Sequence, residues 1–194
     1  MLYDMLKCFI ITAIGNPETE TRRHADQVEE HIIRNALLEL KFDVENNLYR
    51  ADKMICENKY TGMIDHLKND HLCISDITGL NVNVMFEYGF RKATGLPMIV
   101  LASKDDPPQE KLLPFDISTD SIIRYDLTDL DSISTAKSEL KSYARTYLQL
   151  FIEEADYKKR DLDNILDELR ADVKEIKELF KNNNTISNQT GSSP

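Results

Sequence analysis

The segment richest in residues that could do chemistry is Ile74–Gly95, which reads ISDITGLNVNVMFEYGFRKATG. Asp76 ends a short apolar run, and the glycine-containing turn after it carries Asn81 and Asn83. Glu87 follows near the start of an expected helix, where the helix dipole favours an ionised carboxylate. A carboxylate at the end of a buried strand needs a partner, because burying an unpaired charge is costly. We therefore take Asp76 and Glu87 as catalytic candidates.

This pair of carboxylates fits chemistry at a glycosidic bond. Glu87 could attack the anomeric carbon of a sugar, as retaining glycosidases do, or stabilise positive charge that develops on the ring. Asp76 could hold ribose hydroxyls or share a proton, while Gly79, Asn81 and Asn83 would form a substrate-binding turn. The alternative is structural: Asp76 would then cap a plain turn, and Glu87 would be a solvated residue of the first helical turn. Spacing alone leaves both interpretations open.

A second candidate segment follows the first expected strand and contains Thr12, Gly15 and, further on, Arg22 and Arg23. A glycine at this point lets the backbone approach a ligand, and the N-terminus of the next helix suits a phosphate. Arg22 and Arg23 could add charge-assisted contacts to that phosphate. In the alternative interpretation both arginines pair with nearby glutamates on the surface. The single glycine matches neither the dinucleotide-binding GxGxxG motif nor the P-loop.

A third candidate segment is YRAD, which ends with Asp52 after a weak second strand. Asp52 could bind a base or a sugar. A surface salt bridge is the structural alternative.

The elements that must position these residues alternate between strands and helices. Apolar runs predict strands at 7–14, 42–50, 72–76, 98–102 and 121–125, and helical periodicity predicts helices at 21–40, 55–68 and 85–94. Such alternation predicts a compact three-layer α/β sandwich with a mostly parallel five-stranded sheet. Ligands of such sheets bind beyond the carboxyl ends of the strands, which is where the first two candidate segments fall. The proline-containing stretch 104–119 predicts a surface loop.

From residue 129 onward the pattern becomes that of one long helix. Apolar residues recur at alternating steps of four and three, with Lys159 at one position of the series: Leu148, Ile152, Ala155, Leu162, Leu166, Leu169, Val173, Ile176 and Phe180. Either an amphipathic helix lies on its own domain, or a coiled-coil arm joins copies of the chain into a homo-oligomer. The predicted organisation is an α/β domain at 1–128, a helical arm at 129–181 and a disordered tail at 182–194.

Composition excludes several classes of function. The chain has 194 residues, 41% of them hydrophobic, so a core can form. A net charge of −10 argues against a nucleic-acid polymer as partner, although a small nucleotide remains compatible with it. No apolar run approaches the ~20 residues of a membrane span, and residues 1–14 lack a signal-peptide layout. Three widely spaced cysteines disfavour a disulfide framework or a zinc site. We expect a cytoplasmic protein with no membrane partner, no metal and no cofactor.

Three segments together resemble the nucleoside 2-deoxyribosyltransferase-like family: ITAIGNPETETRRHADQV, YRAD and ISDITGLNVNVMFEYGFRKATGLPMIVL. They lie within residues 7–102, and the third is similar to the family's block D-[LI]-T-G-x-N-x-N-V-x-x-E-x-G-x-x-x-A-x-G-x-P. Val82 departs from the proline that many relatives carry between the two asparagines. The resemblance implies a flavodoxin-like sandwich that binds a nucleoside or nucleotide at the strand ends. It also implies that Glu87 is the nucleophile and that Asp76 is the matching strand-end carboxylate.

The activity that this resemblance implies is cleavage or transfer at the N-glycosidic bond of a nucleoside, a deoxynucleotide or a related small molecule. Water as the acceptor gives hydrolysis, and a second base gives transfer. Two other functions stay open. One is an NAD-cleaving effector, distantly similar to TIR domains, that uses the same Glu87. The other is a nucleotide-binding sensor without turnover, as in bacterial defence systems.

Overall fold

The computed structural model describes residues 5–54, 58–104 and 121–189. For positions 59, 155, 171, 172, 175, 176 and 178–189 it describes the backbone alone. The chain divides into two compact units, Met1–Phe151 and Ile152–Pro194. Most of the predicted loop at 104–119 lies outside the described residues, and so do Cys56 and the last five residues of the predicted tail.

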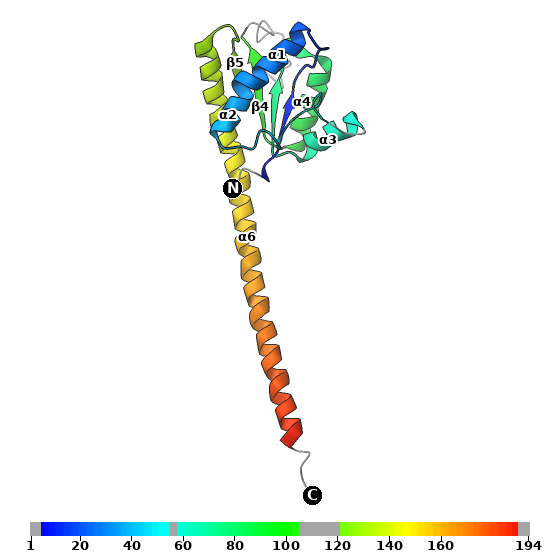
Figure 1. Ribbon diagram of the computed structural model, residues 1–194, viewed down its shortest axis with the longest axis vertical. Coiled ribbons are helices and arrows are strands. Elements are labelled where there is room, and N and C mark those ends of the chain that lie inside the picture. Colours follow the sequence, from blue (N-terminus) through cyan, green and yellow to red (C-terminus); the bar gives the residue numbers. More distant parts are fainter. Residues whose placement is uncertain (1–4, 55–57, 105–120, 190–194) are drawn as a thin grey trace. The chain divides into compact units, whose positions relative to one another are not determined.

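The first unit is built on one parallel sheet of five strands in the order β2-β1-β3-β4-β5 (Figure 1). The strands are β1 (Cys8–Ile11), β2 (Leu48–Arg50), β3 (Leu72–Asp76), β4 (Met98–Ser103) and β5 (Ile122–Tyr125). Every neighbouring pair is parallel, with Phe9 of β1 opposite both Tyr49 and Cys73. The predicted five-stranded parallel sheet is confirmed. Because β2 and β3 lie on opposite sides of β1, the direction of winding reverses between β1 and β3.

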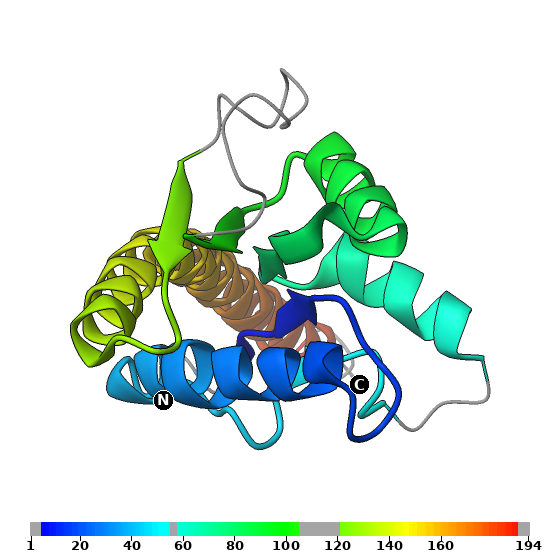
Figure 2. The same cartoon turned by 90° about the horizontal axis from the view of Figure 1, so that it is seen from above.

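Helices cover both faces of this sheet (Figure 2). One face carries α1 (Glu20–Val28), a π-helical stretch η2 (Glu29–Arg34), α2 (Asn35–Glu39) and the start of α6 (Leu130–Gln189). The other face carries α3 (Lys59–Asn69) and α4 (Val82–Thr94). The helix predicted over 21–40 is therefore observed as three consecutive segments, and the sandwich has the three layers that the sequence predicts.

Alternate residues of the strands point to opposite faces, and both faces are buried. Phe9, Ile11 and Cys73 contribute to a core cluster beneath α3 and α4, in which Val84 and Tyr88 are also buried. The burial of both faces explains why these strands appear in the sequence as continuous apolar runs rather than as alternating patterns.

Helix α4 begins and ends where local chemistry requires it. The side-chain Oδ1 of Asn81 accepts hydrogen bonds from the backbone N–H groups of Asn83, at 2.9 Å, and Val84, at 3.4 Å. The helix therefore starts at Val82, three residues before the predicted Met85. Gly95 ends it with a left-handed backbone, φ 71°, as the stop signal predicts.

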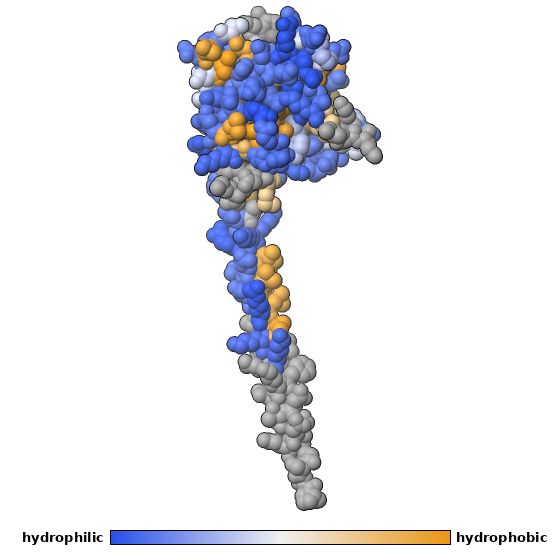
Figure 3. Space-filling model, in the orientation of Figure 1, coloured by the Kyte–Doolittle hydropathy of each residue, from blue (hydrophilic) through white to orange (hydrophobic). Residues whose placement is uncertain are grey.

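Helix α6 begins within the first unit and continues through the second. Ala136, Leu140, Ala144 and Leu148 are fully buried. The first turns of α6 are therefore part of the α/β unit, which extends to Phe151 instead of ending at the predicted residue 128. Farther along, apolar side chains lie exposed in a stripe that Figure 3 shows in orange on the described part of the helix.

The helix also continues beyond the predicted start of the disordered tail at residue 182, since α6 ends at Gln189. The sequence offers a reason: between Asn182 and Gln189 there is neither glycine nor proline, and Gly191 is the first such residue. Within the described residues, no helix has both the length and the apolar composition that crossing a membrane requires.

Candidate functional site

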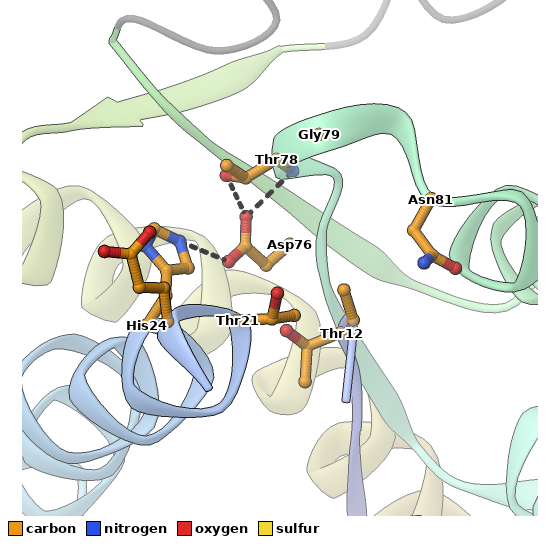
Figure 4. A pocket seen from close by; sticks show the side chains of 9 residues that line it. Thr12, Thr21, His24, Asp76, Thr78, Gly79 and Asn81 are labelled. Atoms are coloured by element: carbon orange, nitrogen blue, oxygen red, sulfur yellow. Dashed lines mark hydrogen bonds and ion pairs between the residues drawn. The ribbon is translucent and has the colours of Figure 1, made fainter. Parts of the chain in front are cut away.

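A cavity of about 330 Å³ lies at the carboxyl ends of β1 and β3, where the winding of the sheet reverses (Figure 4). Its walls come from three segments of the chain: the end of β1, the first turns of α1 and the turn after β3. The lining residues are Thr12, Ala13, Glu20, Thr21, His24, Asp76, Thr78, Gly79 and Asn81. Ligands of doubly wound sheets bind at such a reversal point. Thr12, Asp76, Gly79 and Asn81 were expected from the sequence, and the fold brings them together here.

Asp76 is the buried acid of this cavity, with only 2% of its side chain exposed. Its Oδ1 accepts hydrogen bonds from the backbone N–H of Thr78 at 3.1 Å and from the Thr78 hydroxyl at 2.6 Å. Its Oδ2 accepts a hydrogen bond from the Tyr125 hydroxyl at 2.9 Å. These donors supply the partners that a buried carboxylate requires. The turn that the structural alternative predicts is therefore present, and it holds Asp76 at the cavity wall.

His24 extends this hydrogen-bonded group toward solvent. Its Nε2 lies 2.7 Å from the Tyr125 hydroxyl oxygen and 3.4 Å from Asp76 Oδ2. Because the Tyr125 hydroxyl donates to Asp76, its oxygen accepts a hydrogen bond from His24 in the tautomer that carries the proton on Nε2. His24 then donates to Tyr125 and Tyr125 donates to Asp76, so each of the two hydrogen bonds has its own proton. Such a chain can pass a proton between the cavity and the buried carboxylate.

The sequence did not identify His24, Tyr125 or Thr78 as residues of the site. A signal for Tyr125 was available, because it ends β5 at the same edge of the sheet as Asp76. For His24 the signal was weaker: it lies four residues after Glu20 on one face of α1, and both residues line the cavity. Neither signal identifies the contact between His24 and Tyr125, because that contact depends on how α1 packs against the sheet.

Glu87 lies in the second turn of α4, outside the described walls of the cavity. It is six residues after Asn81, or roughly 9 Å farther along the helix axis. Its side chain is half-buried, and burial raises its pKa from 4.5 to about 7. Within the described part of the chain, its carboxylate has no hydrogen-bond or ion-pair partner. Glu87 is therefore not the solvated first-turn residue of the structural alternative.

Arg22 and Asp52 belong to an ion-pair cluster, and neither lines the cavity. Arg22 Nη2 lies 2.8 Å from Asp52 Oδ2, and Arg50 Nε lies 2.7 Å from Asp52 Oδ1. Burial raises the pKa of Asp52, but the hydrogen bond and charge of Arg50 outweigh it and hold that pKa below its ordinary value. Arg50 also contacts buried Glu29 at 2.9 Å. Arg22 and Asp52 are therefore ion-paired, but the partners of Arg22 are aspartates rather than the predicted glutamates, and Asp52 is largely buried rather than on the surface. Arg23 and Asn83 are exposed outside the cavity walls.

Gly15 makes room for the start of α1. A Cβ atom at this position would lie 2.2 Å from the Thr19 hydroxyl oxygen and 2.9 Å from Thr21 Cβ. Thr19 is the N-cap of α1: its hydroxyl accepts from the Arg22 N–H at 3.2 Å and donates to the Asn16 carbonyl at 2.8 Å. Gly15 thus positions the helix that carries Thr21 and His24, and it does not itself line the cavity.

We expect Gly15→Ala to lower the free energy of unfolding by about 1–3 kcal/mol, because the methyl group collides with the capping hydroxyl. Urea unfolding measures the change. Gly89→Ala is the matched control, since nothing lies within 4 Å of a Cβ added there. That substitution is expected to stabilise the protein by about 0.5–1 kcal/mol, because Gly89 is exposed inside α4. Equal effects of the two substitutions would contradict the close approach at Gly15.

Comparisons with protein-family models and with curated proteins found no match. Among the described residues, no group of three or more His, Cys, Asp or Glu side chains could hold one metal ion. The cavity instead offers a buried carboxylate, the hydroxyls of Thr12 and Thr21, and the amide of Asn81 (Figure 4). These groups suit a small ligand with several hydroxyl or amide groups.

Proposed function

We propose that the protein binds a nucleoside or small nucleotide in this cavity and cleaves or transfers its N-glycosidic bond. The observation that carries the proposal is a buried carboxylate, Asp76, at the reversal point between β1 and β3. In dinucleotide-binding doubly wound sheets, an acidic residue at a strand end binds a ribose hydroxyl. A carboxylate accepts about four hydrogen bonds, and three come from Thr78 and Tyr125. The fourth acceptor site of Asp76 lies toward His24 Nε2, which is 3.4 Å from Oδ2, and it would pass to a sugar hydroxyl when a ligand binds.

The size of the cavity favours a single nucleoside over a dinucleotide. Its volume of about 330 Å³ is near the lower end of small-molecule sites, which range over ~300–1,000 Å³. NAD consists of two joined nucleotides and would exceed the described walls. The described walls therefore hold one nucleoside or mononucleotide, and the second nucleotide of NAD would lie outside them.

In the proposed reaction, the ionised carboxylate of Glu87 attacks C1′ of the sugar. The bond from C1′ to the base nitrogen breaks, and the base leaves with the electron pair. His24 lines the cavity and would supply a proton to the leaving base. Water, or a second base, then attacks C1′ and gives its proton to the deprotonated His24, while the bond from C1′ to Glu87 breaks and frees the carboxylate. Since Glu87 lies outside the described walls, this reaction requires the sugar to extend from Asp76 toward the second turn of α4.

A second function, nucleotide binding without turnover, is favoured by that same position of Glu87. A ligand held by Asp76, Thr12 and Asn81 does not need Glu87. In that case the protein would act as a sensor or signalling module, and substitution of Glu87 would leave ligand binding unchanged.

A chromatographic screen of purified protein against deoxynucleosides, their monophosphates and NAD, with and without a free base, tests the proposal. We expect the wild type to release base from one of the first two classes. Glu87→Gln is expected to lower the rate by at least about 10³-fold, because the amide is a poor nucleophile. Glu139→Gln, at an exposed position of α6, is the matched control and should retain full activity.

Each other outcome selects a different function. Binding of a nucleotide without base release, unchanged in Glu87→Gln, would support the sensor. Cleavage of NAD alone would support the effector. If calorimetry detects no binding of any compound in the screen, the assignment of the cavity to nucleotides is wrong.

A further inference from the structure

The second unit of the chain carries an exposed apolar stripe along α6. Leu162, Leu166, Leu169 and Val173 are between 42% and 57% exposed, as is Ile165 beside them at 46%. The stripe is continuous on the described part of the helix (Figure 3). Exposed leucines scattered singly are ordinary, but a contiguous row of them indicates an interaction surface.

The spacing of the stripe specifies the geometry of its partner. Leu162, Leu166, Leu169 and Val173 follow one another at steps of four, three and four residues. This is the spacing of a coiled coil, in which Leu162 and Leu169 occupy d positions and Leu166 and Val173 occupy a positions. A mean step of 3.5 residues keeps such a seam against one partner helix. The partner is therefore another helix with the same repeat.

Charges beside the seam show that α6 is complementary to itself. The e positions, each directly after a d position, hold Asp156, Asp163, Arg170 and Lys177, all of them exposed. The two acids come first along the helix and the two bases follow. In an antiparallel pair, e positions of one helix face e positions of the other. Asp163 then meets Arg170 of the second copy, and Asp156 meets Lys177.

The apolar seam and the charges require the same register. When Leu166 faces Leu169 of the second copy, Leu162 faces Val173, and the charged pairs of the e positions fall beside these layers. A two-fold axis relates the halves of such a pair, so every contact occurs twice. The charges do not fix the orientation by themselves, because in a parallel pair Lys158 would face Asp163 of the second copy, which is also an attraction between opposite charges.

A parallel pair fits less well because of Lys159. This residue occupies an a position, where a parallel arrangement places it against Lys159 of the second copy. In the antiparallel register Lys159 instead lies opposite position 176 of the second copy, which is an isoleucine in the sequence. We propose that residues 155–180 of two copies form an antiparallel coiled coil. This inference does not depend on the proposed function of the cavity.

Sedimentation analysis of the full-length protein and of Leu166→Asp tests whether this surface joins two copies. We expect the wild type to form a dimer and Leu166→Asp to weaken it by about 100-fold or more, because two charges enter the seam of one dimer. Glu168→Gln, outside the seam, is the matched control and should leave the dimer unchanged. A wild type that stays monomeric, or a Leu166→Asp dimer as strong as the wild type, would overturn the proposal.

Charge exchange tests the orientation. Arg170→Asp places two acids together in the antiparallel pair and is expected to weaken the dimer by about 10-fold. Adding Asp163→Arg restores the attraction and should recover most of the affinity. Lys158→Asp is expected to have little effect, because Lys158 faces Asp163 of the second copy in a parallel pair only. Weakening by Lys158→Asp, without rescue in the double variant, would overturn the antiparallel arrangement. Circular dichroism verifies that each variant keeps its helix.

Discussion

Asp76→Ala is expected to lower the free energy of unfolding by about 3 kcal/mol, although the substitution removes a buried charge. The carboxylate accepts hydrogen bonds from the Thr78 N–H, the Thr78 hydroxyl and the Tyr125 hydroxyl. Alanine leaves these donors beside the cavity without their acceptor, at about 1–3 kcal/mol for each one that stays unsatisfied. Urea unfolding measures the loss. Asp76→Asn retains one carbonyl acceptor and is expected to cost less.

Tyr125→Phe provides the control for this explanation. In a protein that already lacks the Tyr125 hydroxyl, Asp76→Ala leaves one donor fewer unsatisfied and should cost less than in the wild type. The difference between the two costs measures the coupling of the pair in a double-mutant cycle. If Asp76→Ala changes the free energy of unfolding by less than about 0.5 kcal/mol, water in the cavity satisfies the donors. The cluster then contributes nothing to the fold, and its role is confined to a ligand.

The fold was predictable because each element carries its own local signal. Parallel strands are buried on both faces, so β1 and β3 appear as continuous apolar runs. Chemistry at the helix ends fixes their limits, as the Asn81 cap and the left-handed Gly95 do for α4. These signals lie within a few residues of the elements that they define.

The candidate site was predictable only in part, since its contacts join distant segments. Asp76 ends a buried strand, and that alone places it at the ligand-binding edge. The contact between His24 and Tyr125 spans 101 positions in the sequence and depends on how α1 packs against the sheet. The pairing of Arg22 with Asp52 likewise depends on the position of β2 beside β1.

The boundary of the arm shows a different limit of sequence analysis. Ala144 and Leu148 lie on an apolar face of α6 that packs within the α/β unit, whereas Leu166 and Leu169 lie exposed on the same helix. Both parts need apolar residues at steps of three and four. The periodicity therefore predicts a helix over the whole length, and it does not show where packing on the domain ends.

Glu87→Gln is expected to stabilise the protein at alkaline pH and to have little effect on stability in mild acid. Burial raises the pKa of Glu87 from 4.5 to about 7 in the folded protein. Well below pH 4.5, the folded and unfolded states both hold the proton. As the pH rises from 4.5 to 7, the unfolded state loses this proton first, so the wild type becomes less stable. Glutamine cannot ionise and does not undergo this loss.

Unfolding in urea at pH 5 and pH 8.5 measures the effect. The stability of Glu87→Gln relative to the wild type should rise by about 2–3 kcal/mol between these two values, which is what a pKa shift from 4.5 to about 7 implies. Glu139→Gln is the control: Glu139 is exposed on α6, and its substitution should give the same difference at both pH values. A pH-independent effect of Glu87→Gln would show that burial does not perturb this carboxyl.

The stability measurement also bears on function. Within the described residues, Glu87 has no hydrogen-bond or ion-pair partner, so its ionised form weakens the fold. Active sites hold groups that destabilise the folded state but serve the reaction. If Glu87 is the nucleophile, its ionised form attacks C1′. In a His24→Gln variant, which has no His24 proton to lose, the rate of base release should therefore rise with pH through about 7. The same ionisation would then lower stability and raise activity over one pH range. If the rate stays constant across that range while the stability falls, the ionisation of Glu87 affects stability alone, and Glu87 is not the nucleophile.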